Sequence, residues 1–228
     1  MKKATYFLVS FFFLNVNVFD AWGQNLPRCQ TLINPKIEFY STFGKLEYDF
    51  TKNTQEITAL TDTPAAGLAT TRLGHARTLS FHLNRFGRGY CVSAKEIKVY
   101  IGISKPVIYV TKDYLEGSCF QKVVIRHEDA HMQTTIRMLD HFMKNAPKLY
   151  TYMIRHIQPI YAKDQSEIDN AGKVLTKEYD FVMEGMTKEL QREIDVEQEK
   201  LDNETQKYLR TEICWEHMKY YKQYSEDL

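Results

Sequence analysis

A stretch free of proline, from about Asp164 to Tyr221, does most to limit the folds open to this chain. It is rich in Glu, Lys, Gln, Leu and Tyr, and its helix-breaking residues are two glycines, Gly172 and Gly185. Because most of these residue types favour the α-helix, the stretch predicts one or two long amphipathic helices. The C-terminal part of the protein is therefore expected to be helical.

A second helical pattern begins at about Ser118. Apolar residues recur there at spacings of seven, four, three and four, on one face of a helix: Ile125, Met132, Ile136, Leu139 and Met143. Since proline lacks a backbone N–H and its ring crowds the preceding turn, Pro147 is expected to end or kink this helix. A further helical stretch is expected before Pro159.

The first half of the chain predicts β-strands instead. Its strand-like segments combine β-branched and aromatic residues: KIEFY, LEYDF, RTLSFHLN, EIKVYIGI and ISKPVIYV. In the third of them apolar and polar residues alternate, which indicates a sheet with one buried face. The segment TDTPAAGLATT, residues 61–71, is expected to form a loop, and residues 84–89, with two glycines, a hairpin or a bulge.

Strands that precede helices along the chain are typical of an α+β fold. We expect an N-terminal antiparallel or mixed β-sheet, followed by a helical half with a long C-terminal helix. The predicted divisions are a leader at 1–23, a β-rich part at 24–111 and a helical part at 112–228, the last two forming one composite domain.

The N-terminus has the pattern of a secretory signal peptide. Two lysines precede an apolar run at residues 6–13, and the pattern Ala21, Trp22, Gly23, with small residues on both sides of the tryptophan, predicts cleavage before Gln24. The run is too short for a permanent membrane span, although a retained interfacial anchor is an alternative. The protein is therefore expected to be secreted or periplasmic. Export allows up to two disulfides, with the pairing left open, among four cysteines: Cys29, Cys91, Cys119 and Cys214.

The segment IRHEDAHMQ, residues 125–133, contains two histidines four positions apart and a glutamate directly after the first. On a helix, His127 and His131 lie one turn apart on the same face, so both imidazoles can bind one tetrahedral zinc ion. Glu128 can then reach a water molecule on the metal. The pattern H-E-x-x-H thus predicts a zinc site with Glu128 as the general base.

The alternative is that histidine and glutamate fell into this pattern by chance on a polar helix face. The surroundings favour the zinc site, because the motif lies on a predicted helix, beside an apolar stripe, in an exported chain. Asp129 places a further charge inside the motif, where many metallopeptidases of this type carry an uncharged residue.

The motif resembles that of the zincin metallopeptidases, and within them the chain is similar to small secreted bacterial proteins predicted to be zinc-dependent proteases. The likeness extends over most of the mature chain, through Tyr48 and Asp49, a Cys-Val strand at 90–99, the HEDAH helix and a late D-x-E-T at 202–205. It implies a zinc-dependent peptidase. It also implies that a substrate strand lies along a sheet edge, for which residues 106–111 are the candidate.

A catalytic zinc needs a third protein ligand, and the resemblance implies an acidic residue from a later helix. If that helix returns antiparallel after about residue 160, equal rise per residue brings roughly the 190s level with His131. Glu193, Glu197 and Glu204 lie near this level. Glu204 is the expected ligand, because it belongs to the D-x-E-T sequence, and the other two are alternatives. Each of them can instead belong to a solvated helix face.

These features predict a secreted or periplasmic zinc metallopeptidase that acts on a peptide or protein substrate. The alternative is a non-catalytic exported binding or envelope-associated protein with a degenerate or structural metal site. A hydrolase of non-peptide bonds would use the same residues. The formal charge is +1, and the sequence has no Gly-rich phosphate loop and no basic cluster with aromatic residues. Nucleotide and nucleic-acid binding are therefore not indicated.

Overall fold

The computed structural model describes residue 29, residues 34–61 and 64–209, and residue 214, with residues 204–209 described by their backbone alone. The elements in chain order are β1 (Lys36–Phe43), β2 (Glu47–Asp49), α1 (Thr54–Thr58), β3 (Gly67–Phe86), β4 (Gly89–Val110), α2 (Cys119–Arg155), β5 (Ile160–Ala162) and α3 (Gln165–Leu209). The predicted α+β fold, with a sheet followed by a helical half, is confirmed. The predicted leader at 1–23 lies outside the described residues.

β4 is the central strand of a mixed five-stranded sheet. β3 pairs with it antiparallel from end to end, and the turn between them contains Gly87 at φ 57, a left-handed value that glycine adopts without strain. The other edge of β4 pairs with β5 antiparallel and with β1 and β2 parallel. The hairpin predicted at residues 84–89 is confirmed.

Two sequence interpretations of the sheet were wrong. Residues 61–71 are not a loop throughout, because residues 67–70 pair with residues 107–110 of β4. Residues 106–111 do not form an edge, since residues 107–109 lie between β3 and β2. Among the described residues β3 pairs with β4 alone, so the other side of β3 is a free edge, and β1, β2 and β5, which also pair only with β4, form the opposite edge. Such pairings depend on distant partners more than on local propensity.

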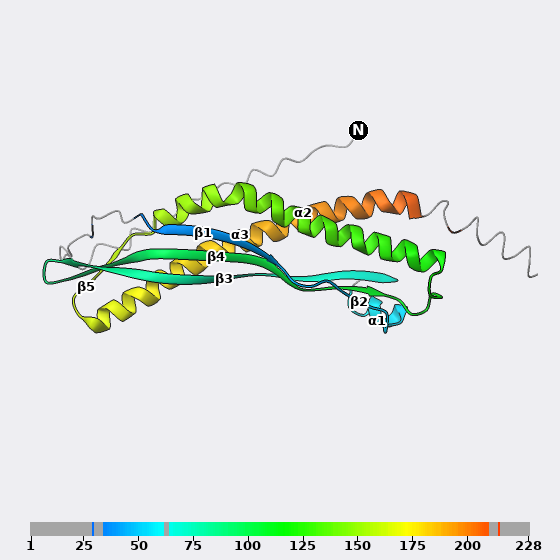
Figure 1. Ribbon diagram of the computed structural model, residues 1–228, viewed down its shortest axis with the longest axis horizontal. Coiled ribbons are helices and arrows are strands. Elements are labelled where there is room, and N and C mark those ends of the chain that lie inside the picture. Colours follow the sequence, from blue (N-terminus) through cyan, green and yellow to red (C-terminus); the bar gives the residue numbers. More distant parts are fainter. Residues whose placement is uncertain (1–28, 30–33, 62–63, 210–213, 215–228) are drawn as a thin grey trace, which may run out of the picture.

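Both long helices cover one face of the sheet, where α2 follows its length and the later part of α3 lies beside α2 (Figure 1). Most of the core belongs to what we term the main cluster. Its buried residues are Val92, Ala94, Ile97, Val99, Ile101, Ile103, Leu139, Phe142, Tyr150, Ile154, Ala162, Ala171, Leu175, Tyr179, Val182, Met183, Met186, Leu190 and Ile194. Alternate β4 residues such as Lys98 and Tyr100 are less buried and lie on the opposite face.

A second and much smaller group of buried residues, which we term the motif-end cluster, packs beneath the H-E-x-x-H helix. It consists of Ile108 and Val110 of β4 and Met132 of α2, all fully buried, with Val124 and Ile125 partly buried against them. The motif is therefore packed on a smaller group of buried residues than the main cluster, and Phe43 packs against both groups.

Pro147 does not end α2, which continues to Arg155. The proline removes one backbone donor, but Phe142 before it and Tyr150 after it are both buried in the main cluster, with ring centroids 6.3 Å apart. Packing on both sides of the proline thus keeps the helix continuous, so the predicted end at Pro147 was wrong, while the alternative of a kink there stays a prediction.

Two disulfides connect the ends of the fold. Cys29 is bonded to Cys91 near the start of β4, and Cys119, the first residue of α2, is bonded to Cys214 beyond the end of α3. The expectation of two disulfides is confirmed. In the described part of the chain, none of the helices combines the length and apolar character that a membrane crossing requires.

Candidate metal centre

The histidine motif lies near the start of α2. Ser118 is the N-cap of this helix, and its hydroxyl accepts a hydrogen bond from the backbone N–H of Gln121 at 3.2 Å. His127 and His131 then lie one turn apart, with ring centroids 4.5 Å apart. Their Nε2 atoms are separated by 3.0 Å. The two imidazoles therefore converge on one point between α2 and α3.

Asp202 of α3 brings a carboxylate to the same point. Its Oδ1 atom lies 2.9 Å from His131 Nε2 and 3.5 Å from His127 Nε2. Ligands bound to tetrahedral zinc at about 2.0–2.1 Å lie about 3.3 Å from one another. The three atoms are thus spaced as zinc ligands are, and together they form a group that can hold a metal ion. The Asp202 side chain is 52% exposed, which leaves the point open to solvent.

Asp202, rather than Glu193 or Glu197, joins the histidines in this group. Glu197 instead contacts Lys200 at 2.5 Å, which lowers the pKa of its carboxyl. The side chain of Glu204 lies outside the described residues, so its role stays a prediction. As expected, α3 runs antiparallel to α2 and brings residues from the late 190s to Asp202 beside His131. Asp202 itself stood in the D-x-E-T sequence and was not considered as a ligand.

Gln198, one turn before Asp202, contacts the far side of the His131 ring. Its Oε1 atom forms a hydrogen bond with His131 Nδ1, and its Nε2 atom donates to the backbone oxygen of His131 at 2.9 Å and to Thr135 Oγ1 at 2.8 Å. The Thr135 hydroxyl in turn donates to the same backbone oxygen at 3.1 Å. The sequence interpretation did not include this glutamine.

Glu128 is buried, at 6% exposed, on the side of α2 that faces β3. Its Oε2 atom accepts a hydrogen bond from the backbone N–H of Ala69 at 2.7 Å. Gly67 makes room for it, because a Cβ atom there would lie 2.7 Å from Glu128 Oε1 and 2.5 Å from Val124 Cγ1. Burial raises the pKa of Glu128 to about 7, although His131 and the Ala69 N–H act in the opposite direction.

Asp129, the additional charge inside the motif, has a structural partner. The Tyr48 hydroxyl of β2 donates a hydrogen bond to Asp129 Oδ1 at 2.6 Å. Since Glu128 contacts β3 and Asp129 contacts β2, adjacent motif residues connect the helix to strands on opposite sides of β4. The charge therefore helps to place the motif over the sheet.

We expect the replacement of Tyr48 by phenylalanine to lower the free energy of unfolding by about 1 kcal/mol, because a hydrogen bond to a charged acceptor is lost. Urea unfolding of the variant measures this difference. Tyr40→Phe, which removes a phenol–carboxylate bond of 2.9 Å to Glu38 on the open face of the sheet, is the control and should cost less. Equal stability of Tyr48→Phe and the parent would show that the contact does not hold the motif.

A pocket of about 400 Å³ opens beside these residues. Its lining consists of Thr61, Pro64, Ala65, Ala66, Gly67, Leu68, Ala69, Val123, Val124, His127, Glu128, His131 and Asp202. Apart from the motif residues and Asp202, the lining side chains are uncharged, and most are small or apolar. Among the described lining residues, a ligand in this pocket would therefore meet charged groups at the candidate metal centre.

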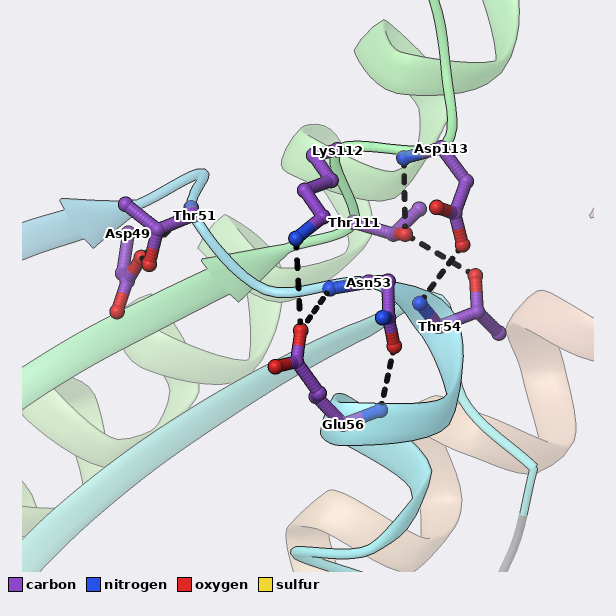
Figure 2. A network of polar contacts seen from close by, with 8 residues as sticks. All are labelled: Asp49, Thr51, Asn53, Thr54, Glu56, Thr111, Lys112 and Asp113. Atoms are coloured by element: carbon purple, nitrogen blue, oxygen red, sulfur yellow. Dashed lines mark hydrogen bonds and ion pairs between the residues drawn. The ribbon is translucent and has the colours of Figure 1, made fainter.

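A polar network joins helix α1 to the residues that follow β4 (Figure 2). Asn53 and Glu56 form a capping box, with bonds of 2.8 Å and 2.7 Å between side chain and backbone. Asp113 accepts a hydrogen bond from the backbone N–H of Thr54 at 2.8 Å, and this bond lowers the pKa of its carboxyl. Ile57 is fully buried beneath the helix. The short helix is thus held to the end of β4.

The wall of the pocket is bonded to both α1 and β4. Thr58 of α1 accepts a hydrogen bond from the backbone N–H of Ala65 at 3.1 Å. The backbone oxygen of Ala66 accepts one from the N–H of Thr111 at 2.9 Å. The wall segment is therefore fixed at its start, just before β3.

Comparisons of the chain with protein-family models, with curated proteins and with solved structures found no match. The likeness to the zincins therefore stays an expectation from the sequence, and peptidase activity stays a prediction.

Proposed function

We propose that this protein is an exported zinc-dependent metallopeptidase, in which His127, His131 and Asp202 hold the metal and Glu128 is the general base. The observation that supports this most is the convergence of two imidazole nitrogens and a carboxylate oxygen, 2.9–3.5 Å apart, beside a buried glutamate in an open pocket.

The charges at this point favour a cation. Asp202 Oδ1 and the two Nε2 atoms all present lone pairs when the imidazoles are neutral and protonated on Nδ1. Three such atoms repel one another at distances of 2.9–3.5 Å. A proton relieves one of these contacts, whereas a metal ion relieves all three. Imidazole and carboxylate ligands suit zinc among the divalent metals.

The roles of the protein residues follow from their positions. A bound zinc ion supplies a Lewis acid that polarises a carbonyl group and makes a water molecule more acidic. Glu128 would accept the proton of the attacking water and pass it to the leaving amine nitrogen. Its hydrogen bond with Ala69 holds the carboxylate against the pocket wall. The uncharged side chains among the described lining residues favour a substrate with an uncharged side chain in this pocket.

An extended substrate would lie along β3 rather than along residues 106–111. Unpaired backbone groups at a sheet edge can bond to an extended peptide, and the free edge of β3 begins at the pocket. A peptide that pairs at Ala69 must compete with Glu128 for its N–H. Substrate binding would therefore release the Glu128 carboxylate from the backbone and leave it free to take a proton.

Export is part of the proposal. Disulfides form and persist in oxidising compartments, and all four cysteines are paired in the structure. Together with the leader-like N-terminus, this supports a secreted or periplasmic protein.

The first test is the metal content of the purified chain from Gln24 onward, measured beside Asp202→Ala. We expect about one zinc ion per chain in the parent and a large loss in the variant, because a three-ligand site loses one ligand. Asp195→Ala, which removes an exposed carboxylate of α3 that accepts from Gln191, is the matched control and should retain the metal. If parent and Asp202→Ala bind zinc equally, Asp202 is not a ligand. If neither binds a metal, the peptidase proposal fails and the binding-protein alternative replaces it.

A further inference from the structure

The orientation of the Gln198 amide follows from chemistry alone. Its NH2 group must face the backbone oxygen of His131, because a carbonyl oxygen can only accept a hydrogen bond. The amide oxygen therefore faces His131 Nδ1, and since this oxygen can only accept, Nδ1 must carry the hydrogen. In the neutral ring Nε2 is then the atom with the free lone pair.

We propose that Gln198 is a positioning residue, which holds His131 in the Nδ1–H tautomer and directs its Nε2 lone pair toward Asp202 and His127. The part of this inference that concerns metal affinity rests on the proposed function. The tautomer itself does not, because the three hydrogen bonds of Gln198 exist without a metal.

The second histidine lacks this support. His127 Nδ1 is buried and has no hydrogen-bond partner within the described residues. One imidazole is thus oriented by hydrogen bonds and the other by packing. Groups that orient a metal ligand from behind contribute to metal affinity, and their loss costs about 10–100-fold. Gln198 is expected to contribute in this way through His131.

The same turn of α3 supplies both the ligand and the orienting group. Gln198 and Asp202 are four positions apart and lie on one face of the helix, opposite His131. Thr135 completes the arrangement, since its hydroxyl donates to the His131 backbone oxygen and so must accept from Gln198. The Gln198 NH2 group therefore donates to both the His131 backbone oxygen and the Thr135 hydroxyl, and a flip of the amide would lose both hydrogen bonds.

Gln198 could also serve only to join α3 to α2, so the test must separate the two roles. Gln198→Leu removes every hydrogen bond at similar volume. Gln198→Glu keeps an acceptor for His131 Nδ1 and loses the donor to the backbone. Gln191→Leu, at a glutamine that contacts Asp195 on the exposed side of α3, is the matched control.

The first readout is the ¹⁵N NMR spectrum of the imidazoles in the full metal-free chain at about pH 8.5, above the ordinary pKa of imidazole. We expect a hydrogen on His131 Nδ1 in the parent, in Gln198→Glu and in Gln191→Leu, whether or not Nε2 also carries a hydrogen toward Asp202, and an Nδ1 that is only partly protonated in Gln198→Leu. The second readout is zinc titration, where Gln198→Leu should bind about 10–100-fold more weakly and Gln198→Glu should recover most of the affinity.

An Nε2–H tautomer in the parent overturns the inference, and this result does not depend on whether any variant folds. Unchanged tautomer and zinc affinity in Gln198→Leu overturn it as well, and leave the glutamine a purely structural contact. If the parent binds no zinc, the proposed function fails, while the metal-free spectra still decide whether Gln198 positions His131.

Discussion

Replacement of Glu128 by glutamine is expected to lower peptide-bond turnover by about a hundred- to ten-thousandfold, the usual contribution of a general base, and to leave the bound metal in place. Glutamine has the same size, and its amide oxygen can still accept the 2.7 Å bond from the Ala69 N–H. Packing against Gly67 is therefore kept. The variant loses the ability to take up a proton and little else.

The measurement compares initial cleavage rates of a mixed peptide library by mass spectrometry, with zinc content determined on the same samples. Glu197→Gln is the matched control, because Glu197 contacts Lys200 on α3 and lies outside the candidate metal group. Turnover in Glu128→Gln equal to that of the parent would remove Glu128 from the mechanism. A parent that binds zinc but cleaves none of the peptides would favour the alternative of a binding protein with a structural metal site.

Removal of the Cys119–Cys214 disulfide should produce the largest loss of stability. The bond closes a loop with a sequence separation of 95 residues, and its removal by a double serine variant is expected to cost about 4–5 kcal/mol through the entropy of the unfolded chain. Zinc affinity should fall in the same variant, because the bond connects the start of α2 to the chain beyond Asp202. Urea unfolding and zinc titration measure the two effects.

The Cys29–Cys91 disulfide, with a separation of 62 residues, provides the comparison. Its removal is expected to cost about 4 kcal/mol but to leave zinc affinity unchanged, since Cys91 lies near the opposite end of β4 from the motif. Equal zinc affinity in both double variants would contradict a role of the Cys119–Cys214 bond in holding Asp202. A stability loss below about 1 kcal/mol would show that the unfolded chain is already compact.

The long helices could be predicted because their signals are local. The proline-free run gave α3, and the apolar stripe gave α2. The expectation that α2 could end at Pro147 was wrong, because buried neighbours on both sides outweigh one missing hydrogen bond. The strand at residues 67–70 was missed because its small residues have little strand propensity, and β4 supplies the pairing.

In the candidate site, too, the residues that are close in sequence could be predicted and most of the distant ones could not. His127, Glu128 and His131 lie within one turn of helix, so their spacing alone predicted how they meet. Asp202 comes from a helix that returns much later in the chain. The equal rise per residue of the two helices predicts which α3 residues lie beside His131 along the axis, but it does not predict which of them face the histidines. Gln198 and Asp202 do repeat the spacing of the two histidines, and this match was available in the sequence. The hydrogen bond from Ala69 to Glu128 depends on sheet pairing, so it could not be predicted from the sequence.

The division between the main cluster and the motif-end cluster has a consequence for the lifetime of the protein in its compartment. Three fully buried residues support the motif end, so this end is expected to open at a lower free energy than the whole fold. A ligand that binds only the closed form raises the cost of opening in proportion to the logarithm of its concentration. If zinc is that ligand, as proposed, proteases that cleave the opened form would remove the metal-free chain first, and the amount of protein would follow the supply of zinc.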